Sequence, residues 1–352
     1  MTMDEIAKLA GVSKSAVSIA INGKPGIGTE TRERILKIAQ EHGYAPKNRE
    51  EDQDSPARSI TFLVFANSGI VLEQYYQQPF FRELIHHIEV RSRMSGYSLL
   101  FSSVDMGSFE RDIRNLAEEK QGDGIILLGT NLDKQHIEEI LARLSTPLVV
   151  LDTCFETLPV HFVQINNVMG AYQAGSHLCE LGHKNIGYIA SNIRMRNFDD
   201  RKQGFIAALR EHGLEIEEGN EFSIAPTILS SQESLKSQLT AYLQTGRPLP
   251  TAYYCECDYI AISAIKTLTE LGFRVPDDVS VVGFDNISES VIVSPELTTV
   301  HVEKERMAQL AVDLLIQSIE SEPAAKHKIM VDTRFIERLS SSSPAHASLT
   351  AK

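Results

Sequence analysis

Short apolar runs alternate with amphipathic stretches over most of this chain, from Ile60 to about Leu339. The apolar runs include ITFLVF, GIILLG, PLVVL, NIGYIA and SVVGF. Apolar runs of about five residues that alternate with helical segments are typical of parallel strands covered by helices on both faces. Because the chain contains more such units than one compact sheet accommodates, the pattern predicts an α/β domain of two lobes over residues 60–340.

Length and composition place the chain among globular proteins of two or three domains. It has 352 residues, of which 42% are apolar and 23% charged. No run approaches the roughly 18 consecutive apolar residues of a membrane span, and the N-terminus lacks a secretory pattern. The four cysteines have no framework spacing, so we expect reduced thiols. These features predict a cytoplasmic protein without a membrane segment.

The N-terminal stretch 4–26 predicts two short helices around a tight corner. Gly11 ends the first helix, because glycine enters a left-handed conformation without a Cβ clash. Ser13 is a suitable N-cap for the second helix. Small alanines permit the steep crossing of a helix-turn-helix, although an ordinary helical hairpin has the same spacing. The apolar residues expected between the helices are Ile6, Leu9, Ala10, Val17 and Ile21.

A longer motif carries a family resemblance. From Ala7 to Pro46 the sequence reads AxxAGVSxxxVSxxINGKPxIxxxTRxRIxxxAxxxGYxP, which resembles the DNA-binding headpiece of the lactose/galactose repressor (LacI/GalR) family. A third helix is expected after Thr29 or Gly28, which completes a headpiece over residues 1–46. The second helix would then enter the major groove of double-stranded DNA. The residues expected to contact DNA are Lys14, Ser15, Ala16, Ser18, Ile19 and Asn22.

The charge distribution bears on how such a headpiece binds. The whole chain has a net charge of −13, but residues 1–46 carry six basic and five acidic side chains, a net charge of +1. Few phosphate contacts per headpiece are then expected, so useful affinity requires two headpieces. We therefore expect a homodimer on a near-palindromic operator.

The linker, residues 47–59, is polar throughout and departs from the family pattern. The resemblance implies a hinge helix whose leucine wedges into the minor groove. Gln53 stands where that leucine is expected, and Glu50 and Glu51 stand where Ala-Arg is usual. We therefore expect no leucine wedge, and either an extended linker on DNA or weak operator binding. The tail, residues 341–352, is predicted to be disordered.

The domain at 60–340 is similar to the two-lobed, periplasmic-binding-protein-like regulatory domain of the same family. By that resemblance, the first lobe spans about 60–162 together with 300–320, and the second lobe spans the remainder to about Leu339. Ligands of open parallel sheets bind beyond the carboxyl ends of strands. Polar residues directly after the apolar runs are therefore informative. This rule selects Asp152, Asp258 and Asp285, with Arg201 at a helix start after an apolar run. The family motifs add Phe80, Phe81 and Cys257, and Asn197 is expected to supply an amide nearby. These eight residues are expected to bind an effector.

The resemblance implies that Arg201 and Asp285 hold polar effector groups. Phe80 and Phe81 are adjacent, so only one of them is expected to face the cleft. The family usually has asparagine where Cys257 stands, and a thiol is a poor hydrogen-bonding group. Arg201 has a structural alternative, which is pairing with an aspartate at 199 or 200, and Asp285 has one as a turn residue at the strand end or a helix cap.

The sequence shows no motif for metal binding, nucleotide binding or catalysis. Cys255 and Cys257 have no nearby histidine pair, which argues against metal binding. No nucleotide-binding loop or catalytic triad stands out. We therefore expect no cofactor, no metal and no enzymatic activity. The family resemblance implies a transcriptional repressor controlled by a small-molecule effector, most naturally a sugar or sugar derivative. The alternatives are a cytoplasmic sugar-binding sensor with weakened DNA binding and an enzyme with an appended headpiece.

Overall fold

The computed structural model describes residues 2–21, 26–42, 58–118, 122–227, 231–321 and 325–344. Contacts divide the chain into two units, Met1–Ala57 and Arg58–Lys352. The boundary at 57 lies within the predicted linker. The linker's hinge positions, Glu50, Glu51 and Gln53, lie outside the described residues.

The first unit contains three helices, α1 (Met3–Ala10), α2 (Lys14–Ile21) and α3 (Thr29–Glu41). Ile6, Val17 and Ile35 are fully buried between them. Gly11 has φ 62°, which confirms the predicted left-handed helix end. The Ser13 hydroxyl accepts a hydrogen bond from the Ala16 amide at 3.2 Å, which confirms the predicted N-cap.

The prediction that Leu9 packs between the helices is wrong, because its side chain is 57% exposed. Ala7 is buried instead, together with Ile6 and Ala10. These three residues centre the buried face of α1, and Leu9 lies about 100° around the helix from that centre. A second feature not predicted is the capping box at the start of α1, in which Thr2 and Glu5 exchange hydrogen bonds.

Lobe 1 of the second unit is built on an all-parallel sheet of six strands in the order β11-β5-β4-β3-β1-β2. The strands are β1 (Ser59–Ala66), β2 (Ser98–Asp105), β3 (Gly124–Leu128), β4 (Leu148–Leu151), β5 (His161–Ile165) and β11 (Lys328–Val331). Both faces are covered, which explains the uninterrupted apolar run of β1. Phe62 and Val64 pack into the core on one face, and Leu63 and Phe65 into the core on the other.

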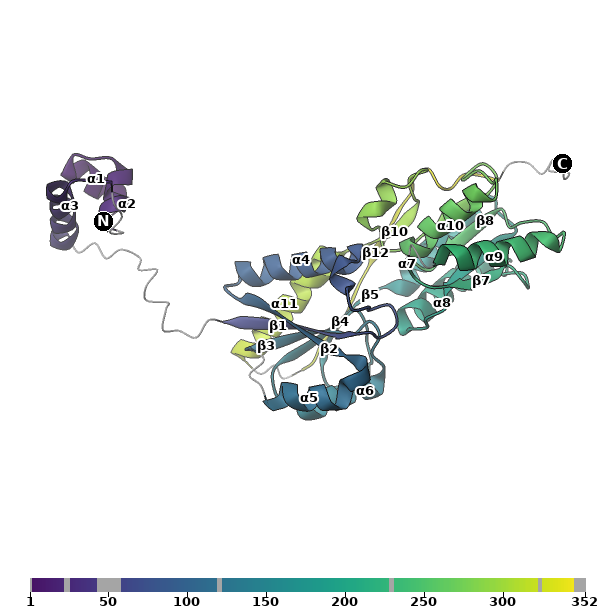
Figure 1. The fold of residues 1–352 in the computed structure, drawn as a ribbon, viewed down its shortest axis with the longest axis horizontal. Coiled ribbons are helices and arrows are strands. Elements are labelled where there is room, and N and C mark those ends of the chain that lie inside the picture. The colour runs from purple at the N-terminus through teal and green to yellow at the C-terminus, as the bar shows by residue number, and fades with distance from the viewer. Residues whose placement is uncertain are drawn as a thin grey trace. The chain divides into compact units, whose positions relative to one another are not determined.

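Helices cover lobe 1 in two layers (Figure 1). One layer contains α4 (Pro79–Met94) and α11 (Lys304–Glu320), and the other contains α5 (Phe109–Glu118) and α6 (Lys134–Arg143). Because α11 contacts β3, β4 and β5, the predicted return of residues 300–320 to lobe 1 holds for this helix.

Lobe 2 has a parallel sheet of four strands in the order β7-β6-β8-β9. The strands are β6 (Ile186–Ser191), β7 (Glu221–Ile224), β8 (Ala252–Cys255) and β9 (Ser280–Val282). Its helices pack in pairs, α7 (Asn167–Glu180) with α8 (Arg196–Glu211) and α9 (Ser231–Gln244) with α10 (Asp258–Glu270). Three short 3₁₀ segments, η1 (Tyr75–Gln77), η2 (Met106–Ser108) and η3 (Ser288–Val291), lie in connections.

The chain passes between the lobes at three points of the described structure, after Ile165, Val302 and Val331. Near the last two points, β10 (Thr299–Val302) and β12 (Thr333–Ile336) form an antiparallel pair. The assignment of residues 321–339 to the second lobe is therefore partly wrong, since β11 is the edge strand of the lobe 1 sheet. Its short alternating pattern carries no signal of which sheet it joins.

The tail begins later than predicted. Ser341 is buried, and its hydroxyl contacts Thr298 and His177 at 2.9 Å. The Ser342 amide donates to the Ser280 hydroxyl at 3.0 Å. The predicted boundary at 341 is therefore too early, because these small hydroxyl residues satisfy buried polar groups of lobe 2. Residues 345–352 lie outside the described part of the chain.

Gly204 gives a test of the packing between α7 and α8. A Cβ at this position would lie 2.1 Å from the carbonyl oxygen of Val168. In an ordinary helix, Gly→Ala stabilises by about 1 kcal/mol. Here we expect Gly204→Ala to lower the free energy of unfolding by about 1 to 3 kcal/mol. Urea titration measures this change, and Gln203→Ala on the exposed side of the same helix serves as the control. A stabilised Gly204→Ala variant would contradict the packing.

Candidate functional site

The first candidate site is the outer side of α2 in the first unit. Five of the six residues predicted to contact DNA lie on this helix, two exposed and three half-buried: Lys14, Ser15, Ala16, Ser18 and Ile19. The sixth, Asn22, lies outside the described residues. The Arg32 guanidinium donates to the Ala20 carbonyl oxygen at 3.2 Å, which ties the end of α2 to α3.

The second candidate site lies where strands of the two lobes end. Asp152 directly follows β4 and has φ 68°, and Asp285 follows β9 after two residues and has φ 119°. Residues other than glycine rarely adopt such positive φ angles, and residues that do so concentrate at functional sites. Both backbones are fixed by amide hydrogen bonds of 2.8 Å, from Asp152 to the Val163 carbonyl and from Asp285 to the Val300 carbonyl.

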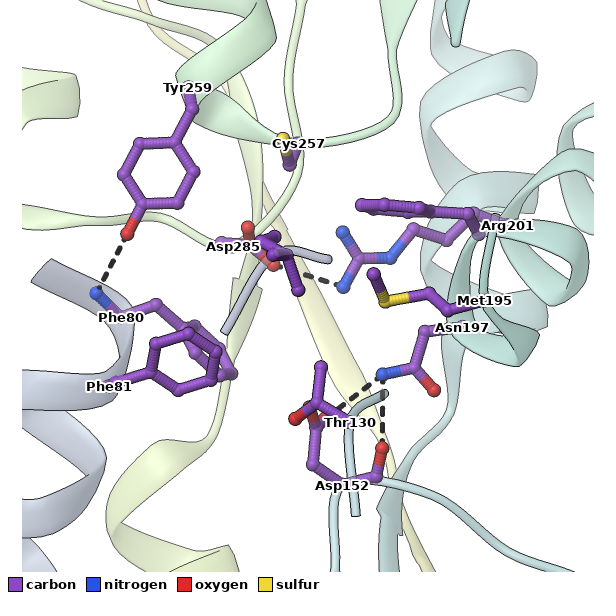
Figure 2. A pocket seen from close by; sticks show the side chains of 12 residues that line it. Phe80, Phe81, Thr130, Asp152, Met195, Asn197, Arg201, Cys257, Tyr259 and Asp285 are labelled. Carbon is purple, nitrogen blue, oxygen red and sulfur yellow. Dashed lines mark hydrogen bonds and ion pairs between the residues drawn. The ribbon is translucent and has the colours of Figure 1, made fainter. Parts of the chain in front are cut away.

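A small cavity of about 30 Å³ lies between the lobes at these strand ends (Figure 2). This volume holds about one water molecule, so a small-molecule ligand requires the lining of the cavity to open. Lobe 1 contributes Ile70, Phe80, Phe81, Thr130 and Asp152 to its lining. Lobe 2 contributes Met195, Asn197, Phe198, Arg201, Cys257, Tyr259 and Asp285. The cavity therefore joins residues from six separate parts of the sequence.

Arg201 is the charged centre of the cavity. It is 4% exposed, and its guanidinium donates three hydrogen bonds. Nε donates to Asn167 Oδ1 at 2.9 Å, Nη1 to the Glu256 carbonyl at 2.6 Å, and Nη2 to Asp285 Oδ1 at 3.0 Å. The guanidinium carbon also lies 3.7 Å from the centre of the Phe284 ring. These contacts fix the plane of the guanidinium.

Burial acts on both members of the Arg201–Asp285 pair. It works against the charge of Arg201, but Asp285 and the further groups Tyr254, Cys257 and Asp152 together outweigh this effect, and the pKa of the guanidinium is raised above its usual range. Burial raises the pKa of the Asp285 carboxyl, and the charge of Arg201 opposes that rise. Each charge is thus tolerated in the interior because of the other.

Asp152 joins the two lobes. Its carboxylate accepts a hydrogen bond from the Thr130 hydroxyl at 2.6 Å in lobe 1 and one from the Asn197 amide at 3.1 Å in lobe 2. The Asn197 amide also donates to the Asp152 carbonyl at 3.1 Å. Burial raises the pKa of Asp152 to about 6, although both hydrogen bonds and the charge of Arg201 favour the carboxylate.

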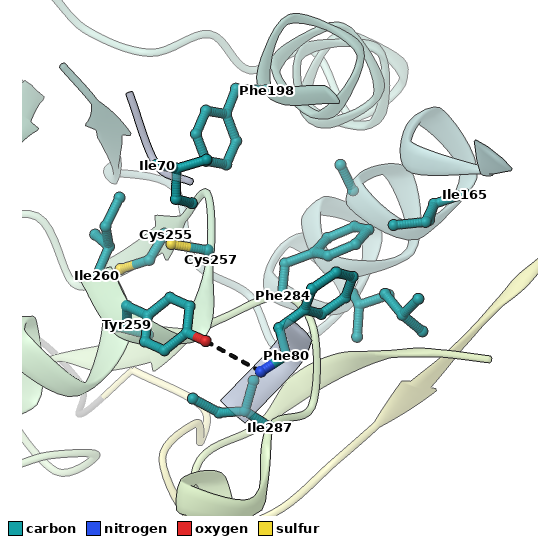
Figure 3. Packing of buried hydrophobic residues seen from close by; sticks show 14 of the residues in the cluster. Ile70, Phe80, Ile165, Phe198, Cys255, Cys257, Tyr259, Ile260, Phe284 and Ile287 are labelled. Carbon is teal, nitrogen blue, oxygen red and sulfur yellow. Dashed lines mark hydrogen bonds between the residues drawn. The ribbon is translucent and has the colours of Figure 1, made fainter. Parts of the chain in front are cut away.

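A second contact joins the lobes on the opposite side of the cavity. The amide of Phe80, at the start of α4, donates to the Tyr259 hydroxyl oxygen at 3.2 Å (Figure 3). That amide belongs to the first turn of a helix and has no partner within the helix. Tyr259 is buried, and burial raises its pKa, so the hydroxyl stays neutral.

Comparison with known proteins assigns the chain to a family. The model of bacterial regulatory proteins of the lacI family matches residues 2–47, and the model of the periplasmic binding protein-like domain matches residues 176–341. The chain is 31% identical to the HTH-type transcriptional repressor PurR of Pasteurella multocida, over 96% of this chain and 98% of that protein. The chain belongs to the LacI family.

Two further proteins illustrate the similarity of this chain to known regulators. The ribose operon repressor of Haemophilus influenzae is 30% identical over 94% of this LacI-family chain and 95% of its own length. Among solved structures, a complex of the transcriptional regulator CelR with cellobiose has a TM-score of 0.69 at 26% identity, and covers 97% of this chain and 99% of its own. These relatives are transcriptional regulators, which agrees with the prediction that the chain is not an enzyme.

Seven of the eight residues predicted to bind an effector line the cavity. Phe80 and Phe81 both line it, so the expectation that only one does is wrong. The structural alternative for Arg201 is excluded, because Asp199 pairs with Arg194 and Asp200 lies near Arg196. The cavity lies between the lobes, where the family resemblance predicts an effector site.

The prediction for Asp258 is wrong. Its carboxylate does not line the cavity but is fully buried in lobe 2. It accepts hydrogen bonds from the Thr299 hydroxyl at 2.5 Å, the Ser290 hydroxyl at 2.6 Å and the Ile287 amide at 3.0 Å. As the first residue of α10, Asp258 is directed away from the cavity and holds η3 and β10 in place.

Five cavity residues were not predicted: Ile70, Thr130, Met195, Phe198 and Tyr259. Thr130 follows β3 by two residues, so the rule that selected Asp152 also applies to it. The other four are apolar or aromatic residues of loops and helix starts. Nothing in their sequence spacing separates them from core residues.

The two neighbouring free cysteines of lobe 2 show no metal-binding features. Cys255 and Cys257 are both buried, and burial raises the pKa of each thiol well above its usual value. Within the described ranges, no group of three or more histidine, cysteine or acidic side chains is arranged to hold a metal ion. The described helices also include none that is long and apolar enough to span a membrane.

The pKa of Asp152 predicts a pH dependence. Because the folded-state pKa of about 6 is above the unfolded value, the folded protein binds more protons and stability falls as pH rises through 6. We expect the wild type to lose about 1 kcal/mol more stability between pH 5 and pH 8 than Asp152→Asn. Urea titrations at both pH values measure this difference, with Asp277→Asn on the surface as the control. Equal pH slopes in wild type and Asp152→Asn would contradict the assignment.

Proposed function

We propose that this LacI-family chain is a transcriptional repressor that binds operator DNA as a homodimer. Lys14 and Ser15 are exposed at the start of α2 and would face base edges in the major groove. Ser18 and the segment near Asn22 would face phosphates, and Ile19 would contact an apolar group such as a thymine methyl. The proposal places the protein in the cytoplasm with its DNA.

We further propose that a small molecule, most naturally a sugar or sugar derivative, binds in the interlobe cavity. The observation that carries this proposal is the buried Arg201–Asp285 pair in the lining of a cavity that Asp152 and Asn197 also line. Fixed carboxylate, guanidinium and amide groups suit neighbouring hydroxyls, which both donate and accept. The relative described as a cellobiose complex and the relative named ribose operon repressor support this class.

A purine-type compound is the second candidate. Relatives named PurR favour it, and Phe80, Phe81 and Phe198 offer flat apolar surfaces on which a planar base would stack. The polar groups of the cavity would then bind the edge of the base.

The proposed control of DNA binding follows from linkage. An effector that contacts both lobes favours one arrangement of the lobes over others. In a dimer, that arrangement would change the separation of the two headpieces. The effector and the operator must then alter each other's affinity by the same factor, which is about 1 to 3 kcal/mol in typical systems. The sensor alternative, in which the headpiece has lost DNA binding, removes this coupling.

Operator binding is testable by its salt dependence. We expect binding to an operator selected from random duplexes to weaken steeply as salt rises, and Lys14→Ala to weaken binding by about 1 to 3 kcal/mol and relax the base preference at one position, because Lys14 would face base edges. Fluorescence anisotropy measures both quantities. Lys37→Ala is the control, because Lys37 is exposed on α3 and pairs with Glu41. If no duplex is selected, or if binding is insensitive to salt, the sensor alternative replaces the repressor.

The effector class is testable by thermal stability. A ligand that binds only the folded protein raises the melting temperature by mass action. We expect a pentose, hexose or disaccharide to raise it, and Arg201→Ala to weaken that ligand by about 100-fold through loss of charged hydrogen bonds. Arg210→Ala, exposed on the same helix, is the control. Stabilisation by purine bases alone would select the second candidate. A ligand that binds Arg201→Ala normally would refute the cavity assignment.

A further inference from the structure

The connection between β6 and α8 carries a feature that the proposed function does not use. We call residues 192–195 the cover segment. Its last residue, Met195, lines the cavity. Its third residue, Arg194, donates hydrogen bonds to both carboxylate oxygens of Glu256, at 2.9 and 2.8 Å. The segment thus contributes to the cavity and is tied to a charged group beneath it.

Glu256 is an unusual anchor because its side chain is fully buried. Besides Arg194, its carboxylate accepts hydrogen bonds from the Tyr188 hydroxyl at 2.7 Å and the Ser191 amide at 2.6 Å. Its carbonyl accepts the 2.6 Å hydrogen bond from Arg201. One residue therefore holds the arginine at the centre of the cavity through its main chain and the arginine of the cover segment through its side chain.

The cover segment also contacts the opposite lobe. A Cβ at Gly69 in lobe 1 would lie 2.6 Å from Cγ2 of Ile193, so the Ile193 side chain packs closely against the backbone of Gly69 because residue 69 has no side chain. Gly69 has φ 67° and precedes Ile70, which lines the cavity. A segment anchored in lobe 2 thus reaches lobe 1 beside the cavity.

We propose that the ion pair between Arg194 and Glu256 locks the cover segment over the interlobe cavity and so slows the release of the effector. The proposal rests on the proposed function for the part that concerns the effector. Glu256 and Arg194 are positioning residues in it, since they act through Ile193 and Met195. The lock can open because Arg194 is 41% exposed and has a second, surface partner in Asp199 at 2.6 Å.

A tryptophan reporter tests the lock without any ligand. The chain contains no tryptophan, so Asn192→Trp, at an exposed position of the cover segment, provides a single emitter. In this background we expect Glu256→Gln to raise the acrylamide quenching constant about twofold or more, because the neutral amide no longer holds Arg194. Asp199→Asn removes only the surface partner and is expected to leave quenching unchanged. An unchanged quenching constant in Glu256→Gln would overturn the lock.

A second variant separates the lock from general damage to lobe 2. Arg194→Met removes the charge from the half-exposed side, together with the guanidinium whose carbon lies 5.8 Å from the centre of the Phe198 ring, and retains an apolar side chain. We expect it to raise quenching as Glu256→Gln does, and the double variant to add nothing further, because both changes break one interaction. Circular dichroism melting identifies variants that have lost the fold. Additive effects of two folded single variants would overturn the pairing.

The test of effector release uses the sugar or base that stabilises the protein most in the thermal screen. We expect stopped-flow dissociation of that compound to be about tenfold faster or more in Arg194→Met, with its association rate little changed. If quenching rises but release does not change, the segment is locked without covering the effector, and the proposal fails. If no compound stabilises the protein, the proposed effector class fails while the quenching result still decides the lock.

Discussion

The buried ion pair between Arg201 and Asp285 sets the conditions for the rest of the regulatory unit. A guanidinium that is 4% exposed requires a partner charge and acceptors for its donors, since an unpaired buried charge is strongly destabilising. Asn167, which supplies one acceptor, directly follows the first passage between the lobes. The Asp285 carbonyl in turn accepts a 3.1 Å hydrogen bond from Lys304, which follows the second passage. The charged centre of the cavity is thus tied to two of the three connections.

Lys304 extends this network to the other lobe. It is 4% exposed and forms an ion pair of 3.1 Å with Glu83 on α4, the helix whose first turn supplies Phe80 and Phe81 to the cavity. A shift of Asp285 would therefore displace Lys304, which follows the second connection between the lobes and is paired with helix α4 of lobe 1. Such a network gives a physical route by which cavity occupancy alters the relation of the lobes. It requires no long-range path, because the groups are in direct contact.

The sequence predicts the fold class and most of the cavity, but for reasons that also limit the prediction. Parallel strands end at one edge of each sheet, so the rule that polar residues follow strands finds Asp152 and Asp285. The same rule misplaces Asp258, because the chain turns into α10 at that residue and directs its carboxylate into lobe 2. The predicted burial of Leu9 is wrong for a similar reason, since the spacing of apolar residues defines a stripe along the helix but does not show which residue lies at its centre. No sequence pattern identifies Tyr259 or Met195 as a cavity residue, because that role depends on which lobe each side chain faces.

The cavity is divided into two sides. Arg201, Asn197 and Asp152 form a polar side, whereas Phe80, Phe81 and Tyr259 form the other, with Cys257 between them (Figure 2). A thiol at 257 removes the amide that the family usually has there, and the Tyr259 hydroxyl is already engaged by the Phe80 amide. Under the proposed function, specific hydrogen bonds are thus concentrated on the first side. The ligand that fits best has one polar edge and one apolar face, which holds for a sugar ring as for a planar base.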